Sequence, residues 1–240
     1  MIILVDGVAY FEFFSSQELG WVREIAPDKY QPGSSVRWAH PREVKPTDSV
    51  LVHRLVDGEV HSDWGYWTLV PPWVEGSASL APTASGDLRL VPPPRTHFNS
   101  RKDTLTKSAG WKRLLQSNRC VLLAKGFFEW SDTDFLPQGH PKMAGRYSLT
   151  GDRLMPLAAI WSPVQVDGRE ILTVSVVTCE PNAQLAALPH HRMPGILLGN
   201  DLRSWMDPKT ETPEHSLHAT PESEIEVRTV VATKFRELVQ

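Results

Sequence analysis

Asn99 and Arg101 have side chains and a spacing that could bind an anionic ligand. They lie two positions apart in the segment HFNSRKDT (97–104), so an extended backbone would place both side chains on one side, just before a helix. An amide and a guanidinium arranged in this way could both contact a phosphate backbone. The same residues could instead order a loop and cap the following helix, and the segment alone leaves both interpretations open.

Glu129 could supply acid or base chemistry. It lies between aromatic residues in GFFEW (126–130), a segment with the composition of a strand. Burying a carboxylate is costly unless it is paired or functional, and burial favours the neutral form that a general acid near neutral pH requires. The alternative is a glutamate that forms a salt bridge at a strand edge.

A third polar group lies in LPHHRMP (188–194), where His190, His191 and Arg192 stand between two prolines. Prolines restrict the backbone, so these side chains should be held more rigidly than in an ordinary loop. Imidazole changes its charge near neutral pH, which suits acid or base catalysis. We expect one of the two histidines to be dispensable.

Tryptophans could bind nucleobases, because every base has a face on which an aromatic ring can stack. The segment WGYWTLVPPW (64–73) contains Trp67 and Trp73, which we consider candidates for this contact. Tryptophans in such segments are also common in hydrophobic cores, so the sequence leaves each of them with two possible roles.

Composition limits the classes of function. A formal net charge of −3 excludes binding of nucleic acid through bulk positive charge, so any DNA contact must be local. The two cysteines, Cys120 and Cys179, belong to no CxxC pair or zinc spacing, so we expect no disulfide, no metal and no cofactor. No apolar run is long enough for a membrane span, and no basic segment precedes the apolar start MIILV. We therefore expect a cytoplasmic protein that does not contact membranes.

The apolar segments are mostly short and rich in Val, Ile, Leu and Trp, which predicts a sheet with few helices. A chain of 240 residues could form one large domain or two small ones. A hairpin is expected at Asp57-Gly58, between a strand over 50–56 and one from 59 onward. Further strands are expected at 119–124, 127–130, 146–149, 154–161, 171–178 and 225–231. Helices are expected at 104–116, 182–188 and 202–206, and loops or excursions at 76–94 and 207–223.

In this order, the segments HFNSRKDT, RCVLLAKGFFEW, VVTCEPN and HHRMP resemble the motifs of the SOS-response-associated peptidase (SRAP) family, and LVPPW is also similar. The resemblance covers roughly 45–206. It implies an α+β fold in a single domain over residues 1–240, with a curved, mixed or antiparallel sheet that forms a barrel-like core and a groove for single-stranded DNA. Matched position by position, it implies a catalytic site of Asn99, Glu129 and His190. It implies DNA-facing or flanking roles for Arg101, Trp130, Thr178 and Arg192.

In that family a cysteine at position 2 captures the aldehyde of an abasic site through its amine and thiol. This sequence has Ile2 in that place, and no cysteine precedes Cys120. The resemblance therefore implies binding of single-stranded, gapped or abasic-site DNA in the DNA damage (SOS) response by a monomer, without the cysteine-dependent crosslink.

Two other functions stay open at this point. One is a weak abasic-site lyase or autopeptidase, in which the amine of Met1 or Lys125 acts together with Glu129 and His190. The other is a structural or protein-interaction relic without catalysis. A peptidase acting on other proteins is the least expected, because no Ser/His/Asp arrangement is evident.

Overall fold

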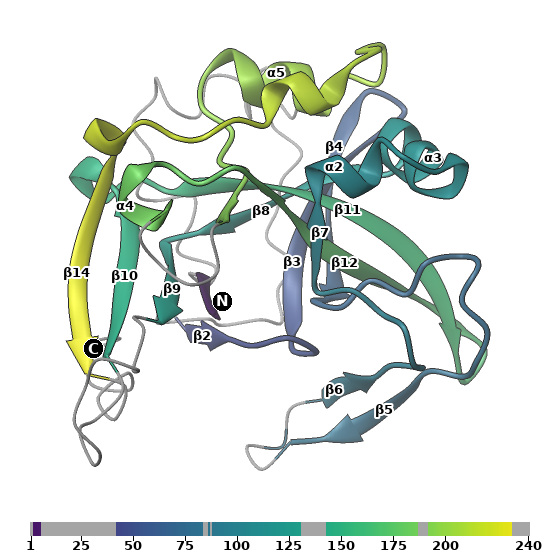
Figure 1. The fold of residues 1–240 in the computed structure, drawn as a ribbon. Coiled ribbons are helices and arrows are strands. Elements are labelled where there is room, and N and C mark those ends of the chain that lie inside the picture. Colours follow the sequence, from purple (N-terminus) through teal and green to yellow (C-terminus); the bar gives the residue numbers. More distant parts are fainter. Residues whose placement is uncertain are drawn as a thin grey trace.

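The computed structural model describes residues 2–5, 42–83, 86, 88–130, 143–186 and 192–231 (Figure 1). Its strands are β1 (Ile2–Val5), β2 (Arg42–Val44), β3 (Ser49–Val56), β4 (Glu59–Tyr66), β5 (Ser79–Pro82), β6 (Leu88–Val91), β7 (Asn99–Arg101), β8 (Arg119–Ala124), β9 (Gly126–Trp130), β10 (Met143–Leu149), β11 (Met155–Val166), β12 (Arg169–Cys179), β13 (Met193–Pro194) and β14 (Ile225–Val231). Its α-helices are α2 (Lys102–Leu105), α3 (Ala109–Ser117), α4 (Ala183–Ala186) and α5 (Asn200–Met206).

Five strands close into a barrel. They pair in the order β11-β8-β3-β4-β12, and a further pairing of β12 with β11 completes the ring. Two hairpins within the ring turn at Asp57-Gly58 and Asp167-Gly168, where both residues of each pair have positive φ, as the tightest hairpin turns require. The α+β fold with a barrel-like core is therefore confirmed, as is the hairpin expected at Asp57-Gly58.

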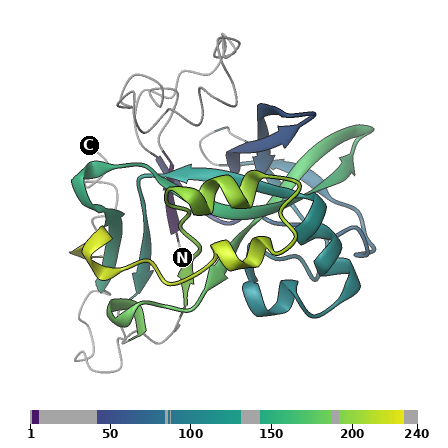
Figure 2. The same ribbon diagram turned by 90° about the horizontal axis from the view of Figure 1, so that it is seen from above.

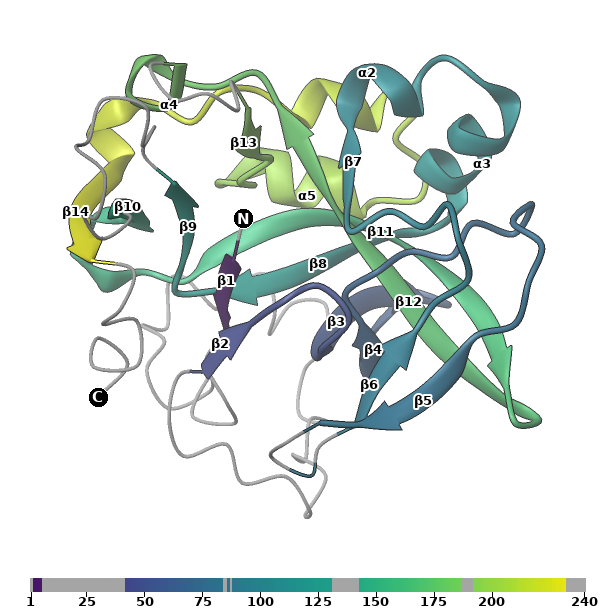
Figure 3. The same ribbon diagram turned by 60° about the horizontal axis from the view of Figure 1, so that its bottom comes forward.

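A second sheet continues from the barrel wall. After Lys125, the chain of β8 passes into β9, and the sheet has the order β14-β10-β9-β1-β2. β1 is antiparallel to β9, with Ile2 opposite Phe128. Figure 3 shows β1 and β9 beside the barrel strands. The first described strand of the chain thus lies next to the strand that carries Glu129.

The helices cover one end of the barrel, and Figure 2 looks down on them. Arg119, buried at the start of β8, joins the C-terminal ends of two of these helices. Its guanidinium donates to the carbonyl oxygens of Leu115 (2.8 Å) and Gln116 (2.9 Å) in α3, and of Trp205 (2.5 Å) and Asp207 (2.6 Å) at the end of α5. Carbonyl groups at helix ends lack partners within the helix, so one buried side chain satisfies both ends.

Two expected elements differ from the structure. The helix expected over 104–116 is two helices, because α2 ends at Leu105 and the backbone of Ser108, just before α3, is extended. The excursion over 76–94 contains the paired strands β5 and β6, in which Leu90 is buried. No helix among the described residues is long and apolar enough to cross a membrane.

Acid should weaken the fold through His53. Burial in the barrel wall lowers the pKa of His53 to about 4, although Asp63 opposes the shift, and its Nδ1 lies 2.8 Å from Ser62 Oγ. In the unfolded chain the imidazole titrates near 6.5, so above that pH it is neutral in both states and the fold keeps its full stability. As the pH falls towards 4, only the unfolded chain gains the proton, and the fold loses stability. Between pH 7 and pH 5 the His53→Gln variant should lose about 2 kcal/mol less stability than wild type in urea unfolding. Equal losses in the two proteins would contradict this.

Arg119→Met should destabilise the protein by about 3 kcal/mol, because it leaves helix-terminal carbonyl groups buried without donors. Urea unfolding at neutral pH measures this change. The matched control is Arg203→Met, which removes an arginine that lies exposed on α5, and this variant should change stability by less than about 1 kcal/mol. A loss for Arg119→Met as small as that of the control would show that its hydrogen bonds do not hold the helix ends.

Candidate active site and DNA-binding surface

Asn99 begins β7, which is parallel to β12 with Asn99 opposite Val176 and Arg101 opposite Thr178. The strand passes directly into α2, so the expected order of strand and helix is confirmed. The side-chain oxygen of Asn99 is buried and has no hydrogen-bond partner in the part of the chain that the structure describes. A buried amide oxygen without a donor costs free energy, and native structures usually satisfy such a group with protein, water or a ligand.

Glu129 lies on β9 and is only 8% exposed. The residue opposite Glu129 on β10 is Gly145. Phe127, which lies on β9 with Glu129, stacks on Tyr147 of β10 with ring centroids 5.0 Å apart. Burial raises the pKa of Tyr147, and the charge of Glu129 raises it further. The carboxyl group thus occupies an aromatic, mostly buried environment, as the sequence predicts.

Asn99 and Glu129 lie in different sheets. β7 pairs with the barrel strand β12, whereas β9 belongs to the second sheet, where β1 is its neighbour. The register of β1 with β9 places Ile2 opposite Phe128, the neighbour of Glu129. The backbone at position 2 thus lies beside the strand segment that carries Glu129.

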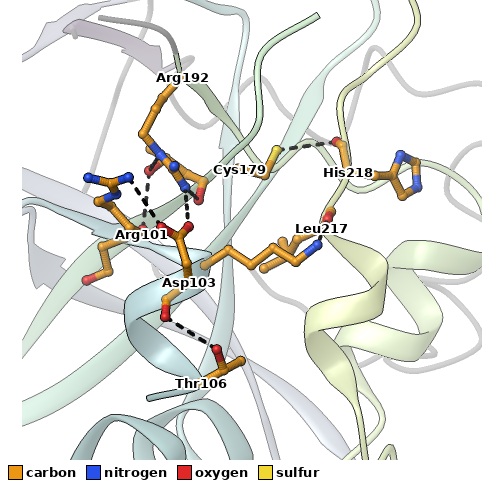
Figure 4. Close-up of polar contacts among 10 residues, drawn as sticks. Arg101, Asp103, Thr106, Cys179, Arg192, Leu217 and His218 are labelled. Atoms are coloured by element: carbon orange, nitrogen blue, oxygen red, sulfur yellow. Dashed lines mark hydrogen bonds and ion pairs between the residues drawn. The ribbon is translucent and has the colours of Figure 1, made fainter. Parts of the chain in front are cut away.

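Two arginines share one carboxylate beside Asn99 (Figure 4). Arg192 NH2 is 3.1 Å from Asp103 Oδ1, and Arg101 NH2 is 3.2 Å from Asp103 Oδ2. Arg192 also donates to Thr178, from Nε to Oγ1 (3.1 Å) and from NH2 to the carbonyl oxygen (2.8 Å). We call Arg101, Asp103, Thr178 and Arg192 the arginine cluster.

The arginine cluster keeps one excess positive charge, because two guanidinium groups face one carboxylate. Burial alone would raise the pKa of Asp103, but a backbone hydrogen bond, Arg192 and Arg101 together lower it, so the carboxylate stays charged. The side chain of Arg192 is 20% exposed and that of Arg101 is 61% exposed. Arg101 is thus the member with the most surface for an anionic ligand, whereas Thr178 is buried and holds Arg192.

Other candidate residues lie partly or wholly outside the described residues. His190 and His191 belong to the segment 187–191, which the structure does not describe, so their roles stay predictions. The backbone of Trp130 ends β9, but its side chain is not among those described.

The tryptophans divide clearly between core and surface. Trp67 is fully buried and its indole nitrogen donates to the carbonyl oxygen of Phe98 (2.7 Å), so the expectation that Trp67 stacks on a base is wrong: it has no exposed face. Trp73 is 47% exposed and its ring meets Trp111 edge to face with centroids 5.1 Å apart. Trp73 also borders a pocket of about 400 Å³, lined by Pro72, Trp73, Gly110, Arg113, Leu114 and Asn118.

Both cysteines are unsuited to nucleophilic attack. Cys120 and Cys179 are fully buried, and burial raises the thiol pKa of both, in Cys179 to about 12. The Cys179 thiol donates to the carbonyl oxygen of His218 (3.3 Å; Figure 4). A thiol that stays protonated at neutral pH is a poor nucleophile.

Sequence reasoning missed Asp103 and Tyr147. Asp103 stands within the segment HFNSRKDT, two positions after Arg101, and this spacing could have indicated a paired carboxylate. Tyr147 has no comparable local signal, because its place beside Glu129 depends on the pairing of β9 with β10.

Removing the amide of Asn99 should stabilise the fold. Asn99→Leu replaces an unsatisfied buried oxygen with apolar atoms and should raise the free energy of unfolding by up to about 1 kcal/mol. The neighbouring Ser100 is the control, because its buried hydroxyl lies 2.8 Å from Ser175 Oγ. Ser100→Val should instead destabilise by about 1 to 2 kcal/mol. Urea unfolding checks both, and destabilisation by Asn99→Leu comparable to that of Ser100→Val would show that Asn99 is structural.

Comparison with known proteins agrees with the fold and the motifs. The family model of the SOS response associated peptidase (SRAP) matches residues 20–234. An abasic site processing protein of Bacillus subtilis, YoaM, is 28% identical over 152 residues, which are 62% of this chain and 58% of that protein. The abasic site processing protein HMCES of Xenopus tropicalis is 32% identical over 208 residues, 77% of this chain and 56% of that protein. The chain thus spans less than two thirds of the length of these curated relatives.

Solved structures share the fold. A protein from Bacteroides thetaiotaomicron has a TM-score of 0.64 at 18% identity, with 95% of this chain and 89% of that chain covered. A phage-related protein from Bordetella bronchiseptica has a TM-score of 0.63 at 19% identity, with 95% and 93% covered. Because the family model matches most of the sequence, the chain belongs to the SOS response associated peptidase (SRAP) family.

Proposed function

We propose that this protein binds single-stranded DNA at abasic sites, with Asn99 and Glu129 at the sugar and the arginine cluster at the phosphates. The observation that carries the proposal is the buried oxygen of Asn99 without a donor. An opened abasic sugar offers hydroxyl groups that could donate to this oxygen. The names of the relatives, abasic site processing proteins, support this choice of ligand.

The charges of the protein support contact with only a few phosphates of the DNA backbone. The net charge of −3 provides no general attraction for DNA, so affinity must come from a few positioned cations. Arg101 meets this need, because it is largely exposed and shares Asp103 with Arg192. The exposed ring of Trp73 offers a face for a base, and Trp130 and His190 remain part of the proposal as predictions from the sequence.

The proposed function is binding rather than covalent chemistry. Residue 2 is isoleucine, and both cysteines are buried with raised thiol pKa values, so no described thiol can form the family's crosslink. The protein would then hold damaged single strands or gaps without a stable bond.

Salt-dependent binding tests the backbone contact. We expect affinity for an abasic single strand to exceed that for duplex DNA and to fall as salt rises. Arg101→Gln should reduce the slope of log affinity against log salt by about 0.7, the value for one phosphate contact on a single strand. Gel-shift titrations across a series of salt concentrations provide the measurement.

Arg228→Gln is the matched control for Arg101→Gln. Arg228 is 71% exposed, is paired with Glu226 at 3.7 Å, and lies on β14, at the far edge of the molecule from α2 in Figure 1. Its removal changes the net charge equally and should leave the slope unchanged. Equal effects of the two variants would mean that Arg101 makes no specific contact. Negligible, equal affinity of wild type for all DNA forms would favour a structural role.

A weak lyase is a second candidate, favoured by the partial burial of Lys125 four positions before Glu129. Its amine could attack the abasic aldehyde, with loss of water, to form an imine, and Glu129 could transfer the proton. Borohydride should then reduce the imine to a stable protein–DNA adduct in wild type and in much lower yield in Lys125→Gln. If wild type gives no adduct while a cysteine-bearing relative does, the lyase is excluded and the binding function remains.

A further inference from the structure

The pocket beside Trp73 has the size and the lining of a site for a small, flat ligand. Its volume of about 400 Å³ lies within the range of small-molecule pockets. Its walls are mainly apolar, and only two of its lining residues, Arg113 and Asn118, have polar side chains apart from the indole N–H of Trp73. We call this site the Trp73 pocket.

Gly110 allows the indole ring of Trp73 to rest directly on α3. A Cβ atom built on Gly110 would lie 2.8 Å from Cζ3 and 3.0 Å from Cε3 of the ring, so any other residue at this position would push the ring away. Trp111 contacts the same ring edge to face. The ring is therefore held from two sides while 47% of Trp73 stays exposed. Such a platform is already in place before a ligand arrives, which reduces the entropic cost of binding.

The polar groups of the Trp73 pocket are available to a ligand. In the part of the chain that the structure describes, neither the guanidinium of Arg113 nor the side-chain amide of Asn118 has a hydrogen-bond or ion-pair partner. Lys112 stands next to Arg113 on α3, and this helix has no acidic residue. A guanidinium binds phosphate, and an amide can donate and accept at the edge of a base. Together with the aromatic wall, these groups fit a nucleotide.

A row of aromatic side chains connects the Trp73 pocket with Asn99. The ring of Trp111 lies 5.1 Å from that of Trp73 and 5.1 Å from that of His97, measured between centroids. His97 and Phe98 are both exposed and directly precede Asn99 in the chain. Exposed rings in succession are surfaces on which the bases of a single strand can stack. A strand bound at Asn99 could follow this row to the pocket.

We propose that the Trp73 pocket binds one nucleotide of the DNA strand held at Asn99, with its base on the ring of Trp73 and its phosphate at Arg113. The amide of Asn118 then faces the base. The choice of a DNA strand rests on the proposed function, whereas the fit of a nucleotide rests on the pocket itself. No member of the arginine cluster lines this pocket, so it is a second contact on the strand.

Affinities for abasic strands that are lengthened one nucleotide at a time, on each side of the abasic site, test the proposal. One such step should raise the affinity of wild type about tenfold, because a base then stacks on Trp73. Gly110→Leu displaces the ring without removing a charge and should abolish the step. Arg113→Gln should reduce it to about threefold or less, because a phosphate contact is lost.

Lys112→Gln is the matched control for Arg113→Gln. It removes an exposed cation from the same helix, next to Arg113 but outside the lining of the pocket, and should leave the step unchanged. Equal effects of the two variants would overturn the proposal, because the change would then reflect net charge alone. A wild-type protein that binds the strands but shows no step sensitive to Gly110→Leu would overturn it as well.

A mononucleotide separates the proposal from the proposed function. Deoxyadenosine monophosphate alone, at millimolar concentration, should shift the NMR signal of the Trp73 indole N–H in wild type and much less in Arg113→Gln. If wild type binds no single-stranded DNA, the proposed function fails, and this titration alone decides whether the pocket takes a nucleotide. An unchanged Trp73 signal would then overturn the pocket too.

Discussion

The parallel pairing of β7 with β12 is the constraint on which the candidate site depends. β12 is held on both sides within the closed barrel, by β11 and by β4, so its position is fixed by the core. β7 adds to the end of this strand and brings Arg101 opposite Thr178, whose hydroxyl then accepts from Arg192. Side chains that bind a ligand precisely are best placed on such rigid elements, and here a three-residue strand inherits the rigidity of the barrel.

Buried polar groups in this protein fall into two kinds. The Arg119 guanidinium has a carbonyl partner in each helix end that it joins, and the hydroxyl groups of Ser100 and Ser175 satisfy each other. Asn99 differs, because its oxygen is buried and lacks a donor among the described residues, as do the side-chain oxygens of Gln184 and Thr220. Satisfied groups stabilise the fold, whereas an unsatisfied group costs stability and is best explained by a ligand that completes it.

The sequence predicted the elements whose signals are local. The strands over 119–124 and 225–231 have the predicted bounds, because continuous apolar or alternating patterns end at clear breaks. It failed where the outcome depends on distant contacts. The sequence left Trp67 with two possible roles, and only the fold shows that it lies in the core. The place of Tyr147 follows only from strand register. The spacing of Asn99 and Arg101 correctly indicated an extended segment followed by a helix. The site roles of Asn99, Arg101 and His190 stay predictions.

NMR titration of the protein with an abasic single-stranded oligonucleotide tests the central claim most directly. The account predicts that the side-chain amide signal of Asn99 and the Nε–H signals of Arg101 and Arg192 shift together at one binding constant, while Arg228 on β14 does not respond. Saturable binding that shifts other signals but leaves the Asn99 amide unchanged would contradict the account, because the unpaired oxygen would then have no part in recognising the ligand.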